Sequence, residues 1–363
     1  MKSKTILLTL SIIVFTVFIS YSQDKNFVGY ATAFIKQDSI VDFNYVGFSD
    51  KENSLKYNSR TIQPIASVSK TFIGISLMIA QEKGLLDLDK DINEYLDFEF
   101  TNPNLNKENT ITLRHLATHT SGVIDNKKAY ESSYALGQEL PNMELGAYLK
   151  EYLVKGGGKY SKKNFSKSSA GTKYEYSNIA SALAAYIIEK ASRKSFDKFT
   201  EEYIFKPLKM NNTGWFYKDI EKVNHAILYD EEDKALQPYS CAVYPDGSLK
   251  TSINDLSIYL IELMKGFHKK SKLLSDDSWT QFFDKNFTDE LPIKNIDKKE
   301  PNSGIFIAYF KSGMIGHTGS DLGVSAIMMF DSEKHIGKIF MSNEDLNENN
   351  LAEFKLIWKN IEQ

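Results

Sequence analysis

The sequence predicts a mixed α/β fold of the α+β type, in which one antiparallel sheet is built from both ends of the chain and carries an inserted, mostly helical lobe. Strand-like segments stand near both ends, and residues 85–299 between them are mostly helix and loop. No Pro-rich, Gly/Ser-rich or long polar stretch offers an interdomain linker. We therefore expect residues 23–363 to form one domain, with a sheet lobe over about 23–66 and 300–363.

The first 22 residues have the pattern of a signal peptide. Lys2 and Lys4 give a positive start, residues 6–19 form an apolar run, and small residues follow. The run is shorter than the about 20 residues that a membrane span needs. Cleavage is expected over retention as an anchor, which stays the alternative. The segment thus predicts an exported protein, periplasmic or secreted, with no stable membrane span after cleavage.

The strands of the sheet are predicted from both ends of the mature chain. Residues 29–36 and 40–47 are β-rich and are separated by Gln37-Asp38-Ser39, a pattern typical of an antiparallel hairpin. Near the other end, strands are expected over 304–310, 323–330 and 335–341. A closing helix is expected over about 349–361.

A strongly apolar helix is predicted over residues 67–84, just before the helical lobe, and it ends at a glycine. It is apolar on most faces, so we expect it to be buried in the middle of the protein. Further helices are predicted over 178–191, 196–205 and 251–265. The active site is expected where the helical lobe meets the sheet.

Composition excludes several function classes. The net charge of −3 comes from 44 basic and 47 acidic side chains that are well mixed, which gives no basic surface for nucleic acid. Cys241 is the only cysteine, so no internal disulfide is possible. We expect it to be a small buried side chain rather than a catalytic thiol.

Ser67 and Lys70 are the first candidates for chemistry. A serine hydroxyl needs a nearby base to act as a nucleophile, and residues three apart on a helix share a face. Burial at the start of an apolar helix would favour the uncharged amine of Lys70, and the helix end leaves backbone N–H groups free to polarise a carbonyl. The spacing recurs at Ser22 and Ser195, but only Ser67 opens a buried helix.

Tyr176-Ser177-Asn178 stands at the start of another apolar helix. A tyrosine beside a buried lysine can carry protons, and an asparagine can fix an amide carbonyl. The alternative is a plain helix cap, because Ser and Asn favour helix starts.

Gly316-His317-Thr318-Gly319 lies between two predicted strands. The glycines would let a substrate lie close to the strand edge. Thr318 could hydrogen-bond a substrate carboxylate, and His317 could add positive charge or a donor. The alternative is a hairpin turn.

Together and in this order, the three sites resemble those of the class C β-lactamase and DD-peptidase superfamily of penicillin-recognising serine hydrolases. That family carries Ser-x-x-Lys, Tyr-x-Asn and Lys/His-Thr-Gly. Further segments are similar to its sequences, and the resemblance runs from about residue 27 to residue 343. These segments are residues 111–122, 204–210, 247–252 and 323–326.

The resemblance implies a role for each matching residue. Ser67 would form an acyl-enzyme, and Lys70 and Tyr176 would relay its proton to the leaving group and later activate water. Asn178 would orient the substrate amide and support Lys70. The backbone N–H groups of Ser67 and Ser320 would form the oxyanion hole. No cofactor and no metal are implied.

The third site departs from the class C pattern, because His317 replaces lysine. A neutral imidazole binds a substrate carboxylate less strongly than an ammonium does, which counts against efficient β-lactam hydrolysis. We therefore expect a D-amino-acid peptidase or amidase first, an esterase second and a β-lactamase third. The substrate would be a cell-wall peptide, a β-lactam or an ester. A penicillin-binding sensor that acylates without turnover is the alternative of a different class.

The sequence does not support a zinc protease or an α/β-hydrolase, and the role of one lysine-rich segment remains open. His115 and His119 stand four apart, but position 116 is leucine rather than the glutamate of zinc proteases. The Gly-x-Ser-x-Gly elbow of α/β-hydrolases is missing. Residues 155–173 hold six lysines and no acid, which is typical either of a basic loop that steers anionic substrates or of a solvated flexible loop.

Overall fold

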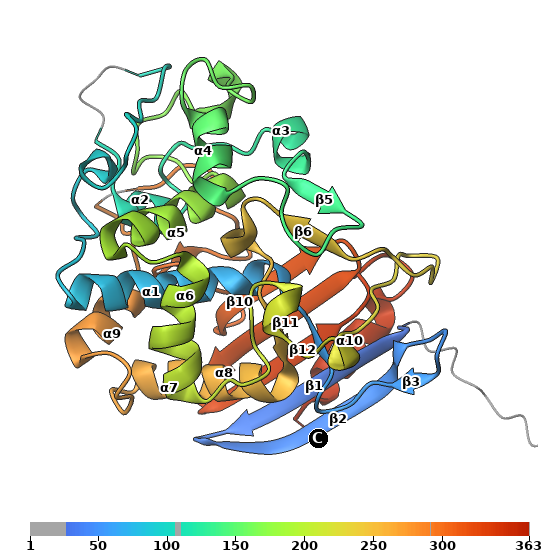
Figure 1. The fold of residues 1–363 in the computed structure, drawn as a ribbon. Helices are drawn as coiled ribbons and strands as arrows, with labels where there is room; N and C mark the ends of the chain where they lie inside the picture. Colours follow the sequence, from blue (N-terminus) through green and yellow to red (C-terminus); the bar gives the residue numbers. More distant parts are fainter. Residues whose placement is uncertain (1–26, 106–109, 291, 363) are drawn as a thin grey trace, which may run out of the picture.

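The computed structural model describes residues 27–105, 110–290 and 292–362 (Figure 1). The expected signal peptide therefore lies outside the described residues. Eight strands form one antiparallel sheet in the order β3-β2-β1-β12-β11-β10-β9-β8. The strands are β1 (Gly29–Lys36), β2 (Ser39–Asp50), β3 (Leu55–Lys56), β8 (Asn302–Ser303), β9 (Ala308–Tyr309), β10 (Ile315–Asp321), β11 (Val324–Asp331) and β12 (Ile336–Ser342). The predicted fold class is confirmed.

The two ends of the chain meet inside the sheet. Strand β1 pairs with β12 from Tyr30 opposite Ser342 to Lys36 opposite Ile336, and Figure 1 shows the blue and red strands side by side. Side chains alternate between the two faces. Ala31, Ala33 and Ile35 enter the main core, whereas Tyr30 packs on the opposite face.

Each face of the sheet is covered by a helix. Helix α8 (Ile253–Phe267) lies against β1, β11 and β12, although its residues fall in the range assigned above to the helical lobe. The opposite face is covered by α10 (Leu351–Asn360), whose Phe354 and Trp358 pack against Tyr30 and Phe340. The closing helix thus covers the face of the sheet opposite to the main core.

The helical lobe is built around α1 (Lys70–Glu82), which packs against α5 (Asn178–Ser192) and α9 (Asp276–Phe283). Every residue from Lys70 to Ala80 is buried, as the apolar pattern predicts. The remaining α-helices are α2 (Leu113–Ala117), α3 (Lys127–Glu131), α4 (Leu145–Leu153), α6 (Phe196–Thr200) and α7 (Lys206–Leu208). Two small sheets pair β4 (Ile62–Pro64) with β7 (Lys250–Ser252) and β5 (Tyr134–Leu136) with β6 (Tyr239–Cys241).

Two local predictions are wrong, and one of the alternatives left open above is excluded. Ser67 lies in a 3₁₀ turn, Ala66–Ser69, and α1 begins only at Lys70. The strand predicted over 304–310 is a tight hairpin, in which β8 and β9 flank a turn closed by Gly304 N–H on the carbonyl of Ile307. The segment 316–319 is not a turn, because its residues continue the ladder of β10 along β11.

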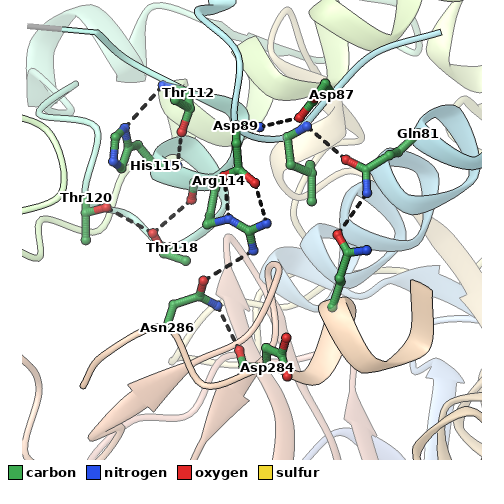
Figure 2. A network of polar contacts seen from close by, with 12 residues as sticks. Gln81, Asp87, Asp89, Thr112, Arg114, His115, Thr118, Thr120, Asp284 and Asn286 are labelled. Carbon is green, nitrogen blue, oxygen red and sulfur yellow. Dashed lines mark hydrogen bonds and ion pairs between the residues drawn. The ribbon is translucent and has the colours of Figure 1, made fainter. Parts of the chain in front are cut away.

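A polar network fixes α2 to its neighbours (Figure 2). The Arg114 guanidinium donates to both carboxylate oxygens of Asp89, at 2.6 and 2.8 Å. It also contacts Asn286, which bonds to Ser303 of β8. His115 Nδ1 accepts from the Thr112 N–H in a capping box. The network holds the first turn of α2 in place.

The half-buried carboxyl of Glu189 gives the fold a testable pH dependence. It accepts from Phe196 N–H at 2.8 Å and from the Tyr244 hydroxyl at 3.4 Å, and burial raises its pKa to about 7. The folded protein therefore keeps a proton that the unfolded chain releases above its ordinary pKa near 4.5. The contribution of this proton to the free energy of unfolding is fully present below pH 4.5 and is lost as the pH rises through about 7.

We expect Glu189→Gln to remove about 2–3 kcal/mol of the fall in unfolding free energy between pH 5 and pH 8. Urea unfolding at both pH values measures this difference. The exposed Glu231→Gln is the matched control and should keep the wild-type slope. A Glu189→Gln protein with an unchanged slope would contradict the assignment.

Candidate active site

Lys70 lies at the centre of the site and is fully buried. Its Nζ is 2.9 Å from Ser67 Oγ, 2.7 Å from Asn178 Oδ1 and 2.7 Å from the backbone carbonyl of Asp246. Ser67 precedes it on the 3₁₀ turn, where Ala66 has a φ of +46°. Such a backbone is strained for a residue with a side chain and occurs often at functional sites. The structure therefore brings two of the predicted residues, Ser67 and Asn178, to the Lys70 nitrogen, together with the Asp246 carbonyl, which was not predicted.

Asn178 is held at this place by the start of α5. Ser177 is the N-cap and accepts from Ala180 N–H, so the helix-cap interpretation is correct and is compatible with a role in the site. The Asp125 carboxylate accepts from Ser177 Oγ, Asn178 N–H and Ile179 N–H, at 2.7, 2.8 and 3.1 Å. A carboxylate at a helix N-terminus is favoured by the helix dipole. Sequence reasoning missed Asp125, which lies more than 50 residues from its partners.

Tyr176 is half-exposed, at 39%, and presents its ring to the site. Lys70 Nζ lies 5.1 Å from the centre of that ring. The His119 ring packs on the same tyrosine with a centroid distance of 4.3 Å. The hydrogen bonds of Lys70 go to Ser67, Asn178 and Asp246, so Tyr176 is beside the lysine without a direct bond to it.

His119 is a site residue whose place the sequence did not indicate. Its Nδ1 accepts from Ser177 N–H at 3.2 Å, and its backbone has a φ of +55°. Burial, together with the charges of Lys70 and His317, lowers the pKa of His119 well below its ordinary value, so the ring is neutral. The only earlier signal was its spacing from His115. Within the described residues, no three His, Cys, Asp or Glu side chains form a group that could hold a metal.

His317 lies on β10 and is buried. Its Nδ1 is 2.6 Å from the carbonyl of Thr318, which can only accept, so Nδ1 carries the proton and Nε2 presents a lone pair. Burial and the charge of Lys70 lower the pKa of His317 to about 4. At neutral pH the ring is therefore uncharged, and Nε2 can accept a hydrogen bond but cannot donate one.

Gly319 lies against the turn that carries the nucleophile. A Cβ at this position would be 2.4 Å from the carbonyl oxygen of Ile65 and 3.0 Å from the backbone nitrogen of Ser67. Ser320 follows on the same strand, and its Oγ donates to Asp345 Oδ1 at 2.8 Å. The two backbone N–H groups proposed for the oxyanion hole therefore belong to directly adjacent segments.

Acidic groups surround Lys70 at longer range. The Asp246 carboxyl is buried and accepts from the Tyr130 hydroxyl at 2.8 Å, and burial raises its pKa to about 7. The Asp321 carboxyl accepts from the Tyr134 hydroxyl at 2.9 Å, and burial raises its pKa. The groups around Lys70 are thus two acids and two neutral histidines. A site with a lysine in place of His317 would have a second positive charge to bind a substrate carboxylate, and this site lacks that charge.

Other sequence predictions concern residues away from the nucleophile. Cys241 is a buried free thiol beside Ser133, as expected. The basic segment 155–173 is anchored in part, because the buried Asn164 amide donates to the carbonyls of Tyr152 and Lys159, and Lys173 pairs with Glu175 at 2.5 Å. Its steering role stays a prediction. In the part of the chain that the structure describes, no helix is long and apolar enough to span a membrane.

Solved structures share this fold. An octameric penicillin-binding protein homologue from Pyrococcus abyssi superposes with a TM-score of 0.72 at 21% identity, over 94% of this chain and 76% of that one. A class C beta-lactamase gives a TM-score of 0.70 at 18% identity, over 93% of this chain and 92% of that one. At these identities the likeness shows the fold alone.

Sequence relatives point in the same direction. "Penicillin-binding protein 4*" of Bacillus subtilis is 24% identical over 327 residues, which is 84% of this chain and 64% of that protein. The chain spans between 56% and 64% of the length of the first curated relatives it matches. The Beta-lactamase family model matches residues 15–359. The chain is therefore a member of the Beta-lactamase family, with the serine hydrolase fold that its penicillin-binding and class C relatives share.

Proposed function

We propose that this protein is an exported hydrolase that cleaves amide or ester bonds through an acyl-enzyme on Ser67. The observation that carries the proposal is the set of three contacts around Lys70 Nζ. Asn178 Oδ1 and the Asp246 carbonyl can only accept, so each takes one N–H of Lys70. Once Lys70 has given up its proton, its lone pair faces Ser67 Oγ, which lies 2.9 Å away, and can accept the hydroxyl proton as a general base.

The chemical steps follow from this arrangement. The Lys70 amine takes the Ser67 proton while Oγ forms a bond to the substrate carbonyl carbon, and the resulting oxyanion is held by the N–H groups of Ser67 and Ser320. When the carbonyl re-forms, the bond to the leaving group breaks and the leaving group receives the proton through Tyr176. Water, deprotonated along the same route, then attacks the ester and frees Ser67.

Among substrates, a D-amino-acid peptide is our first choice and a carboxylic ester is the second. The neutral His317 ring supports the ester alternative, because an uncharged group gives a substrate carboxylate no ion pair. The same observation supports placing β-lactams third. Export rests on the pattern of the first 22 residues, and N-terminal sequencing of the protein isolated from the native cell envelope or medium tests it.

Covalent labelling tests the nucleophile. Intact-mass spectrometry should show a single fluorophosphonate adduct on the wild type and none on Ser67→Ala. The control is Ser177→Ala, which removes the serine at the start of the buried helix α5 and should still be labelled. Labelling that survives in Ser67→Ala would overturn the mechanism. Turnover of a D-Ala-D-Ala peptide, a p-nitrophenyl ester and nitrocefin then separates the substrate classes, and an adduct without any turnover would favour the sensor alternative.

A further inference from the structure

A small cavity opens beside Tyr176 and His317, the two residues that flank the reaction centre on the side of β10. About 20 Å³ of it is open to the centre of a water-sized sphere, which is room for one water molecule or one small group such as an ammonium or a methyl. The proposed mechanism gives the leaving group its proton through Tyr176. A substrate group in this cavity therefore belongs to the leaving group.

Aromatic rings form the walls of this cavity. His119 packs against Tyr176 at 4.3 Å, against Phe306 at 5.6 Å and against Tyr174 at 6.0 Å between ring centres. Tyr174 in turn packs edge-on against Phe287 at 6.0 Å. Ring faces carry negative potential and attract cations. Since both lining histidines are neutral, these walls contribute no opposing charge at neutral pH.

One carboxylate completes the lining. Glu300 is half-buried, and burial and the neighbouring Asp297 raise its pKa while Lys299 lowers it. Its charge also raises the pKa of the Tyr174 hydroxyl, after the larger effect of burial. No lysine or arginine is among the described residues that line the cavity. Lys70 is not among these residues, and its Nζ lies 5.1 Å from the centre of the Tyr176 ring.

Two further polar side chains of the lining, Asn302 and Ser303, are already engaged. The Asn302 amide donates to the carbonyl of Phe287 and its oxygen accepts from the Phe287 N–H. Ser303 Oγ donates to the carbonyl of Gly304. These bonds fix the Phe287 wall, and Glu300 is the one carboxylate among the described residues that line the cavity.

We propose that this cavity, named here the aromatic cavity, binds a primary ammonium group on the leaving group of the substrate. The inference rests on the proposed acyl-enzyme mechanism and adds a substrate class to it: esters or amides of amino alcohols or diamines. A carboxylate would be repelled by Glu300 and by the ring faces. A methyl group would fill the space but would cover Glu300 without giving it a partner.

Three matched esters test the inference: phenylacetyl esters of 4-aminobutan-1-ol, butan-1-ol and 4-hydroxybutanoate, whose leaving groups are cationic, neutral and anionic. We expect kcat/KM of the wild type to be at least 10-fold higher for the ammonium ester than for the neutral one, and lowest for the carboxylate. Glu300→Gln should lower kcat/KM for the ammonium ester at least 10-fold and leave the neutral ester within 3-fold. Glu290→Gln, an exposed glutamate of the same segment, should change none of them.

A wild type that prefers the carboxylate ester, or a Glu300→Gln variant that changes all three esters equally, would overturn the proposal. If ester turnover is too slow to measure, the rate of fluorophosphonate labelling decides. Methylammonium should then slow labelling of the wild type at lower concentration than acetate does, and Glu300→Gln should abolish that difference. Absence of Ser67 labelling would contradict the acyl-enzyme mechanism itself, whereas normal labelling without a preference for the cation would contradict this inference alone.

Discussion

Lys70→Met is expected to lower kcat/KM by about 10⁴-fold while the protein still folds. Methionine fills nearly the same buried volume but cannot accept the Ser67 proton. Asn178 Oδ1 and the Asp246 carbonyl each lose a donor, at roughly 1–3 kcal/mol for each group. Removal of a buried ionisable group offsets part of that cost. Steady-state kinetics with the best ester or peptide of the panel, together with thermal unfolding, measure both effects.

Lys250→Met is the matched control for this prediction. Lys250 is also buried and donates to two carbonyls, those of Trp215 and Ser248, and burial lowers its pKa to about 8. It makes no hydrogen bond to Ser67. Its replacement should cost a similar amount of stability and leave kcat/KM within about 10-fold of the wild type. Equal losses of activity in the two variants would show that packing, not proton transfer, is the function of Lys70.

Gly319→Ala is expected to reduce kcat/KM by about 10²–10³-fold, the range found when one oxyanion-hole donor is lost. The new methyl group would lie 2.4 Å from the Ile65 carbonyl oxygen, which is backbone and cannot rotate away. Strand β10 must therefore move away from the turn that carries Ser67, and the two N–H groups of the oxyanion hole separate. The lost hydrogen bond stabilises the transition state more than the bound substrate. We therefore expect a large fall in kcat and only a small change in KM.

Gly247→Ala provides the control on the other side of the same turn. A Cβ there would lie 3.6 Å or more from Ala66, which is ordinary van der Waals contact. Its activity should remain within a few-fold of the wild type. A Gly319→Ala enzyme with wild-type kcat would show that the carbonyl is stabilised elsewhere.

Local patterns in the sequence predicted much of this fold. The β-rich segments of β1 and β12 and the apolar run of α1 are each mostly buried along the whole element, so a short window of sequence is enough to recognise them. The run over 304–310 misled because the turn is made by Phe306, whose φ is +53°. An aromatic residue rarely adopts that backbone, so nothing in the sequence marks it.

The site was predictable only in part, for a similar reason. Ser67 and Lys70 are three residues apart, and their geometry is that of one turn. Asn178 lies 108 residues from Lys70, and only the order of the three motifs connected it with the nucleophile. Asp125 and the Asp246 carbonyl bond to residues that are distant in the sequence and are brought close only by the fold. Every residue has a backbone carbonyl, so the sequence does not mark which one bonds to Lys70.

The pairing of β1 with β12 has a consequence for how the molecule is made. Ser342 Oγ donates to the carbonyl of Gly29 across 313 residues of chain, so the central ladder of the sheet cannot close until Ser342 has been synthesised. The β1–β2 hairpin is finished early, and the free side of β1 then waits for its partner. Closing so long a loop makes folding slow and leaves an open strand exposed to other chains in the meantime. A chaperone that shields this early hairpin would thus raise the yield of folded protein more than one that acts on the helical lobe.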